Sequence, residues 1–178
     1  LRGEIDDKNW DVNPQEILFK QNNFQNKTYS INKLEAFGIF NKDHYRVKKI
    51  DLDLTPIEIN ELFKSPELLI AKDTVVALRI ILKANMNLLF LKDKSLKEHF
   101  FYESFTETRE LINHKYLKVN DGSLLLHENK MYIAQLNLLF SDCSKMKKIN
   151  VLEFDLKSLV EKFIAYNDCM GCSSVCYV

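Results

Sequence analysis

The sequence predicts a single α+β domain, in which several amphipathic helices pack with a small antiparallel sheet. Two observations carry this prediction: helix-start signals recur along the chain, and one Asp-Gly pair lies between two apolar runs. Hydrophobic residues make up 46% of the 178 residues and charged residues 28%, which is typical of a folded domain with its own core. We expect residues 1–168 to form this domain and residues 169–178 to form a cysteine-bearing C-terminal tail.

Two helix starts combine a capping side chain with a proline. Asn13-Pro14 and Thr55-Pro56 each place a capping residue before a proline at the first helical position, and a glutamate follows two residues later. These signals predict helices over residues 14–21 and 56–64. The second helix should end before Ser65-Pro66, because a residue that precedes proline disfavours helical geometry.

A third helix start, at Asp155, precedes the clearest amphipathic pattern in the chain. Apolar residues recur after it with the spacing of one helix face, at Leu156, Leu159, Val160, Phe163 and Ile164. The pattern predicts a helix from residue 156 to about residue 166.

The middle of the chain is richer in apolar residues. Residues 73–83 are apolar on most sides of a helical projection, which predicts a buried helix, and residues 88–91 form a short apolar run typical of a strand. Residues 44–54 alternate apolar and charged side chains, although imperfectly, and so predict a strand with one exposed face.

A hairpin is predicted over residues 116–127. Asp121-Gly122 supplies the turn residues that two twisted strands require, and apolar runs flank it on both sides. Residues 131–140 form a further apolar segment whose periodicity fits either a strand or a helix.

The order of a helix at 73–83, a short helix at 95–102, a helix at 106–114 and the hairpin at 116–127 resembles a winged-helix arrangement. In such an arrangement the third helix reads DNA with basic and amide side chains, whereas here it carries two glutamates and one arginine. The resemblance therefore implies binding of a protein or peptide rather than DNA. An ordinary helix packed beside a hairpin explains the same order.

The composition excludes several functional classes. Lys plus Arg and Asp plus Glu both total 25, so no overall charge favours a nucleic acid, and we expect nucleic acid not to be a partner. No apolar run reaches the roughly 20 residues of a membrane-spanning helix, which predicts no integral membrane segment. Only four glycines are present, too few and too scattered for a nucleotide-phosphate loop, and no hydrolase-type Ser/His/Asp order stands out.

The cysteines are the strongest candidates for chemistry. Cys169, Cys172 and Cys176 follow a C-x2-C-x3-C pattern in the tail, and Cys143 is the remaining cysteine. Thiolates at this density can hold zinc or an iron–sulfur cluster, with Cys143 as the fourth ligand or His127 in its place. They can equally form disulfides, be modified or captured by an enzyme, or fill core space as small apolar residues.

A thioredoxin-type redox pair is disfavoured at Cys169 and Cys172. The pair follows the C-terminus of the helix predicted at 156–166, whose negative end raises thiol pKa values, instead of preceding a helix N-terminus. The compartment depends on the state of these cysteines, and reduced thiols would favour the cytoplasm.

Two acidic groups are weaker candidates. Asp6, Asp7 and Asp11 surround Trp10 and could form a protein-binding spot with an aromatic anchor, although a tryptophan more often fills core space. Asp51-x-Asp53 would aim two carboxylates to one side of a strand, which an exposed strand face explains equally well.

The function predicted from the sequence is that of a non-enzymatic protein-binding or regulatory domain, such as an immunity or antitoxin protein. The first alternative is a zinc-binding or iron–sulfur domain that uses the C-terminal thiolates. The second alternative is a carrier or precursor protein whose cysteine tail is modified or captured by an enzyme.

Overall fold

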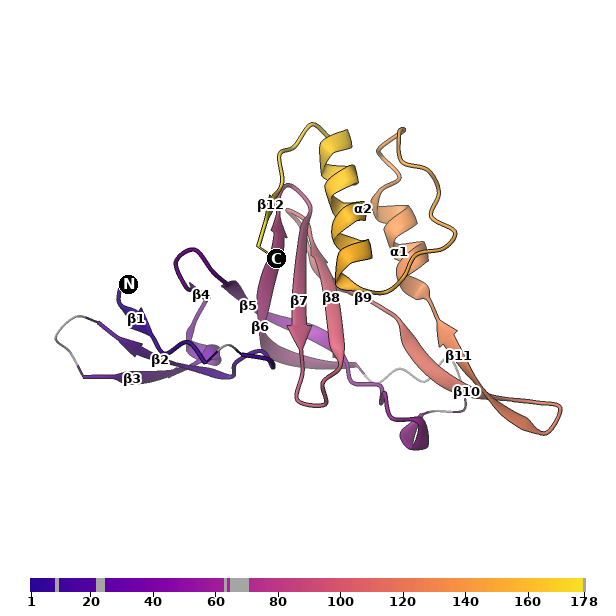
Figure 1. Cartoon of the computed structure of the whole chain (residues 1–178), viewed down its shortest axis with the longest axis horizontal. Helices are drawn as coiled ribbons and strands as arrows, with labels where there is room; N and C mark the ends of the chain where they lie inside the picture. The colour runs from indigo at the N-terminus through magenta and orange to yellow at the C-terminus, as the bar shows by residue number, and fades with distance from the viewer. Residues whose placement is uncertain (9, 22–24, 63, 65–70, 178) are drawn as a thin grey trace.

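The computed structural model describes residues 1–8, 10–21, 25–62, 64 and 71–177 (Figure 1). These residues form mainly β-strands, together with α-helices near the C-terminus and short 3₁₀ turns at Ile31–Lys33 and Ile59–Glu61. The strands are β1 (Glu4–Ile5), β2 (Glu16–Lys20), β3 (Lys27–Ser30), β4 (Ala36–Gly38), β5 (His44–Asp53), β6 (Ala71–Lys83), β7 (Asn87–Lys92), β8 (Glu98–Glu103), β9 (Thr108–Leu111), β10 (His114–Asn120), β11 (Ser123–Asn129) and β12 (Val175–Cys176), and the helices are α1 (Met131–Leu139) and α2 (Leu156–Cys169).

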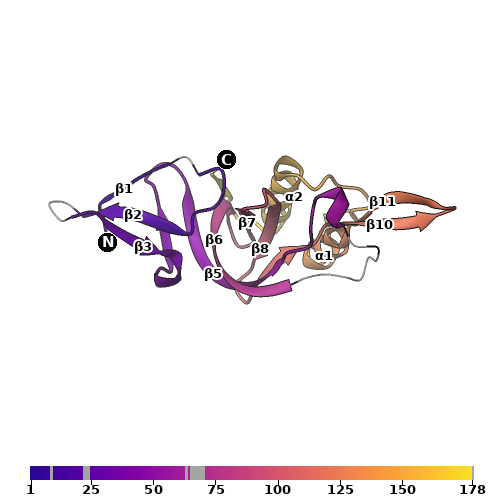
Figure 2. The ribbon, with the colours of Figure 1, turned by 90° about the horizontal axis from the view of Figure 1, so that it is seen from below.

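A large antiparallel sheet organises the molecule. Its strands lie in the order β4-β5-β6-β7-β8-β9, and β12 pairs with β6 beside Leu82 and Lys83. The sheet curls, as Figure 2 shows, so that the end of β5 approaches β9. There the backbone N–H of Asp53 donates to the Glu110 carboxylate, with a distance of 2.7 Å between Asp53 N and Glu110 Oε2. Two smaller sheets, β1-β2-β3 and β10-β11, lie at opposite ends of the molecule (Figure 2).

Strand β6 runs through the centre of this sheet and contributes to three apolar clusters. Both of its faces are covered, so most of its apolar side chains are buried: Val76, Ala77, Leu78, Ile80, Ile81 and Leu82. A strand that is covered on both faces has a continuous apolar sequence. The sequence of a buried helix can look the same. The helix predicted at 73–83 is therefore wrong, whereas the strands predicted at 44–54 and 88–91 are confirmed as β5 and β7.

The helices pack together on one face of the large sheet (Figure 1). Tyr132 and Leu136 of α1 and Leu159 and Phe163 of α2 are fully buried against β6, β7, β8 and β9. The predicted cap of α2 is confirmed, because the Asp155 side chain accepts a hydrogen bond from the backbone N–H of Ser158 at 2.8 Å. Residues 131–140, for which the sequence allowed a strand or a helix, contain α1.

The α+β prediction, with several amphipathic helices and a small sheet, is wrong. The described structure is mainly β and its largest element is the curled antiparallel sheet, and the two proline-marked segments illustrate why the prediction failed. The Asn13 amide does not cap a helix but donates to the carbonyl oxygens of Ala77 and Phe90, at 2.8 and 3.1 Å, and β2 follows it. The Thr55 side chain donates to the Asp53 carboxylate, and only the 3₁₀ turn Ile59–Glu61 forms in the described part of 56–64.

The winged-helix resemblance is also overturned, because strands β6, β8 and β9 stand where it requires helices at 73–83, 95–102 and 106–114. The predicted hairpin is confirmed as β10 and β11. Its two turn residues, Asp121 and Gly122, have φ angles of 48° and 79°, the left-handed conformation that a two-residue hairpin turn requires. No helix in the described residues is long and apolar enough to cross a membrane.

Candidate functional site

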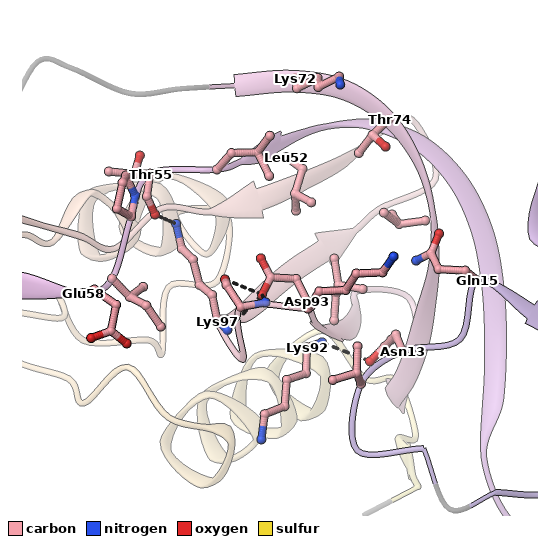
Figure 3. Close-up of a pocket in the computed structure, with 18 of the residues that line it drawn as sticks. Asn13, Gln15, Leu52, Thr55, Glu58, Lys72, Thr74, Lys92, Asp93 and Lys97 are labelled. Carbon is pink, nitrogen blue, oxygen red and sulfur yellow. Dashed lines mark hydrogen bonds between the residues drawn. The ribbon is translucent and has the colours of Figure 1, made fainter. Parts of the chain in front are cut away.

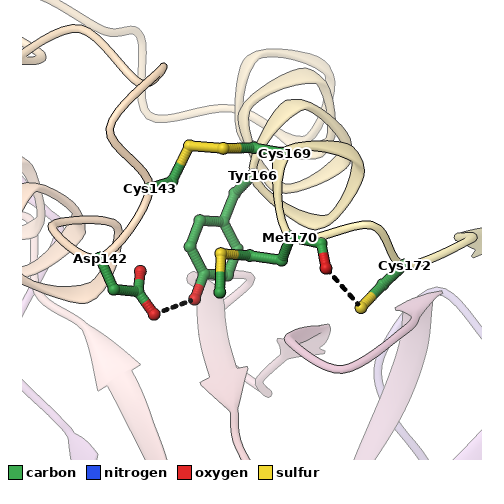
Figure 4. Close-up of a disulfide and its surroundings, with 6 residues drawn as sticks. All are labelled: Asp142, Cys143, Tyr166, Cys169, Met170 and Cys172. Carbon is green, nitrogen blue, oxygen red and sulfur yellow. Dashed lines mark hydrogen bonds between the residues drawn. A yellow bond between two sulfur atoms is a disulfide. The ribbon is translucent and has the colours of Figure 1, made fainter.

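Two of the four cysteines form a disulfide. Cys143, in the loop after α1, is bonded to Cys169, the last residue of α2, with their Cα atoms 6.3 Å apart (Figure 4). Beside this bond the Tyr166 hydroxyl donates to Asp142, with 3.1 Å between the oxygens. Burial, together with this hydrogen bond, raises the pKa of Tyr166 to about 12, so the hydroxyl keeps its proton at neutral pH. The disulfide fixes the loop after α1 to the end of α2.

The other two cysteines are free thiols. Cys172 is half-buried, with its sulfur 3.5 Å from the carbonyl oxygen of Met170, and Cys176 is exposed on β12. The backbone N–H of Tyr177 donates to the carbonyl oxygen of Ile81 at 2.8 Å, so the tail pairs with the end of β6, beyond the stretch that pairs with β5.

The described residues do not assemble the thiolate set that a zinc or iron–sulfur site requires. Cys143 and Cys169 are bonded to each other, and no group of three or more His, Cys, Asp or Glu side chains in these parts of the chain is placed to hold a metal ion. The metal-binding alternative therefore stays a prediction that this geometry does not support.

Trp10 and its neighbouring aspartates lie at the side of the large sheet. The Trp10 ring is half-buried and meets Phe37 and Tyr45 edge to face, at centroid distances of 6.1 and 5.8 Å. Asp6 lies 3.9 Å from Lys8, and Asp7 pairs with Lys42. Asp11 is exposed. Trp10 thus packs against an apolar cluster of the protein's core. The protein-binding role predicted for Trp10 and the three aspartates stays a prediction.

A buried ion pair that the sequence analysis missed joins the end of β5 to the loop before β8. The Lys97 ammonium lies 2.9 Å from Asp53 Oδ2, and both side chains are buried. It also donates to the backbone oxygens of Asp53 and Thr55, each at 3.0 Å. Because an ammonium has three N–H groups, these acceptors use all of its donors. Asp51, the other carboxylate of the predicted Asp51-x-Asp53 pair, is exposed, so the two differ in environment.

A histidine adjoins this ion pair. The fully buried His99 ring lies between two carboxylates, with Nδ1 2.6 Å from Glu110 and Nε2 3.3 Å from Asp93. Burial raises the pKa of Asp93, but hydrogen bonds from Ser95, His99 and the Lys97 backbone outweigh it, and the net pKa lies below the usual value. Both ring nitrogens are already engaged, so His99 is not placed to act on a substrate.

Two of these groups, Asp93 and Lys97, line a pocket of about 540 Å³ between the ends of β5 and β7 (Figure 3). Lys97 and Thr55 on its wall bond to each other, as the dashed line in Figure 3 shows, and the Asn13 amide accepts from the backbone N–H of Lys92 at 3.0 Å. The buried polar atoms named here have protein partners. Their hydrogen bonds fasten the loops around the pocket.

The hairpin β10–β11 carries exposed apolar side chains in a regular arrangement. Pairing places Leu117 opposite Leu126 and Val119 opposite Leu124, so these four share one face of the hairpin. Val119, Leu124 and Leu126 are 61%, 54% and 50% exposed, and Leu125 on the other face is 44% exposed. The hairpin projects from the molecule beyond the helices (Figures 1 and 2).

Comparisons with known proteins add no assignment, because no protein-family profile, no curated protein and no solved structure matches the chain.

Proposed function

We propose that the chain is a protein-binding domain without catalytic activity of its own, and that the hairpin β10–β11 is the arm that contacts the partner. One observation carries this proposal: an ordered hairpin holds Val119, Leu124 and Leu126 together on one exposed face. A single exposed apolar residue is common on protein surfaces, whereas several on one face are typical of an interaction site.

The arrangement of the charged groups also favours binding over catalysis. An acid, base or nucleophile must reach a substrate atom, but Lys97 and His99 are buried and already bonded to protein acceptors. The buried cluster is consistent with a structural role in holding the curled sheet, which leaves the projecting hairpin as the better candidate for function.

The disulfide supports a location for the protein in an oxidising compartment. Disulfides persist where glutathione and thioredoxin do not reduce them, so the bond between Cys143 and Cys169 favours such a compartment over the cytoplasm. Intact mass measured with and without reductant tests this: protein isolated from its own cells should gain two hydrogen atoms on reduction, and an unchanged mass would contradict the proposal.

Site-specific photo-crosslinking tests the binding proposal. A benzophenone amino acid at Leu124 should give a crosslinked adduct in cells that make the protein, because the partner contacts the hairpin at this strand. The matched control is the same probe at Val151, which is 79% exposed but lies in the loop before α2. Equal labelling at both positions, or no adduct from Leu124, would contradict the proposal, and mass spectrometry identifies the partner.

A further inference from the structure

We infer that the partner of the hairpin is a second copy of this chain, joined by antiparallel pairing of the outer edge of β11 with the same edge of the copy. This inference rests on the proposed function, since it names the partner of the same hairpin. It places a two-fold axis beside Leu125 and joins two hairpins into one four-stranded sheet.

Strand β11 has one edge that no described strand pairs with. The residues that flank a two-residue turn exchange backbone hydrogen bonds, and bonded and non-bonded pairs then alternate along an antiparallel hairpin. Starting from the pair Asn120–Ser123, the backbone groups of Leu125 point to β10, whereas those of Leu124 and Leu126 point outward. Among the residues that the structure describes, no strand pairs with this outer edge.

Residues 123–127 of this edge lack the features that prevent strand pairing. Exposed edges are commonly protected by lysine, proline or a bulge. The opposite edge of the hairpin, β10, carries Lys115 and Lys118, whereas β11 contains no lysine or proline, and its one acidic residue, Glu128, lies near its base outside residues 123–127. The pairing of β10 with β11 is regular throughout. Of the two hairpin edges, β11 is therefore the one suited to pairing.

Strand β11 is complementary to a second copy of itself. The segment Ser123-Leu-Leu-Leu-His127 is symmetric in character about Leu125. Antiparallel pairing centred there places Leu125 opposite the partner's Leu125, Leu124 opposite the partner's Leu126, and Ser123 opposite the partner's His127. Leucine then faces leucine at three positions, and no like charges oppose each other.

The backbone geometry agrees with this register. Leu124 and Leu126 have outward-pointing N–H and C=O groups, so the pair formed by Leu124 and the partner's Leu126 is a hydrogen-bonded one. Leu125 and its copy then form the non-bonded pair on the axis. The contact is the same for both chains, as a two-fold interface requires, and it closes at two copies.

Sedimentation of the purified chain tests the pairing. The parent protein should show a concentration-dependent equilibrium between one chain and two. Leu126→Pro removes an outward N–H that the dimer needs but not one that β10 uses, so it should raise the dissociation constant at least about tenfold. Leu126→Lys should do the same without a change of backbone.

Val119→Lys is the matched control. Val119 shares the apolar face and is more exposed than Leu126, but it lies on β10, away from the proposed edge. It should leave the dissociation constant within about twofold of the parent. If Val119→Lys weakens the dimer as much as Leu126→Lys, the two hairpins pack face to face and the edge pairing is wrong.

A cysteine at residue 125 tests the register directly. In a non-bonded antiparallel pair the Cα atoms lie about 4.5 Å apart, which a disulfide can span. In a Cys172→Ser, Cys176→Ser background, Leu125→Cys should form a disulfide-linked dimer under mild oxidation, whereas Glu128→Cys should not. Absence of the Leu125→Cys crosslink, or equal crosslinking at Glu128→Cys, would overturn the register.

These results separate the two proposals. If the purified chain stays a single copy at high concentration, the dimer is wrong, and photo-crosslinking from Leu124 still decides whether another protein uses the hairpin. If the probe at Leu124 gives no adduct beyond that at Val151, the proposed function itself fails.

Discussion

At the scale of single residues, buried charges close the curl of the sheet. Lys97 meets Asp53 at the end of β5, and Glu110 on β9 accepts from the backbone N–H of Asp53 and contacts His99. These side chains come from separate segments, and they connect the end of β5 to β8 and β9 where the described residues show no backbone pairing between β5 and β9. Removing one partner of such a group leaves the other charge buried without compensation.

Replacement of Lys97 by methionine should therefore lower the free energy of unfolding by about 3–5 kcal/mol, because Asp53 would remain buried without its cation. Urea denaturation of the two proteins measures the difference. Lys94→Met, at an exposed lysine in the same loop, should change the free energy of unfolding by less than about 0.5 kcal/mol. A loss at Lys97 no larger than that at Lys94 would show that the ion pair does not hold the curl.

At the scale of elements, local signals predicted the structure wherever a segment keeps its own capping and turn residues. The α2 helix and the hairpin follow Asp155 and Asp121-Gly122 as expected. The prediction failed where a residue that could cap a helix makes a tertiary contact instead. The Asn13 amide, for example, donates to the carbonyl oxygen of Ala77 on β6, 64 residues away. No periodicity in the sequence distinguishes such a contact from a helix cap.

The cap of α2 at Asp155 predicts a pH-dependent contribution to the free energy of unfolding. A hydrogen bond from the Ser158 backbone holds the pKa of Asp155 below its usual 3.8. A carboxylate with a lowered pKa stabilises the fold above the unfolded value, and this contribution is lost as the pH falls through the folded value. Asp155→Ala should lower the free energy of unfolding by about 0.5–2 kcal/mol at pH 7.

The difference from the parent should shrink as the pH falls below 3.8, once Asp155 is protonated in the folded chain. Thermal or urea unfolding across the acid range measures it. Asp168→Ala, at the negative end of the same helix, should show no loss at pH 7. A pH-independent loss at Asp155 would contradict a capping role for its charge.

At the scale of the whole molecule, one covalent link joins the helical layer. The disulfide connects residues 26 positions apart, from the loop after α1 to the end of α2. The sequence indicated Cys143 and Cys169 as candidates, but the choice between metal and disulfide required their positions in space. The exposure of Leu124 and Leu126 could not be predicted either, because a run of leucines in the sequence does not show whether another layer of the fold covers it.

The double variant Cys143→Ser, Cys169→Ser should unfold with about 3 kcal/mol less free energy than the oxidised parent, since a loop of this length then regains its freedom in the unfolded chain. Reductant should destabilise the parent by a similar amount and leave the double variant unchanged, as urea midpoints will show. Cys172→Ser with Cys176→Ser should match the parent in oxidising buffer, because neither thiol is bonded. A parent insensitive to reductant would refute a stabilising role.

The length of the hairpin has a consequence for any assembly built on it. Each strand has seven residues, so the arm reaches about 24 Å from its base to its tip. Two such arms, paired antiparallel, leave their folded bodies at opposite ends of the shared sheet. In the proposed dimer the arm would therefore act as a spacer that holds the two folded bodies apart.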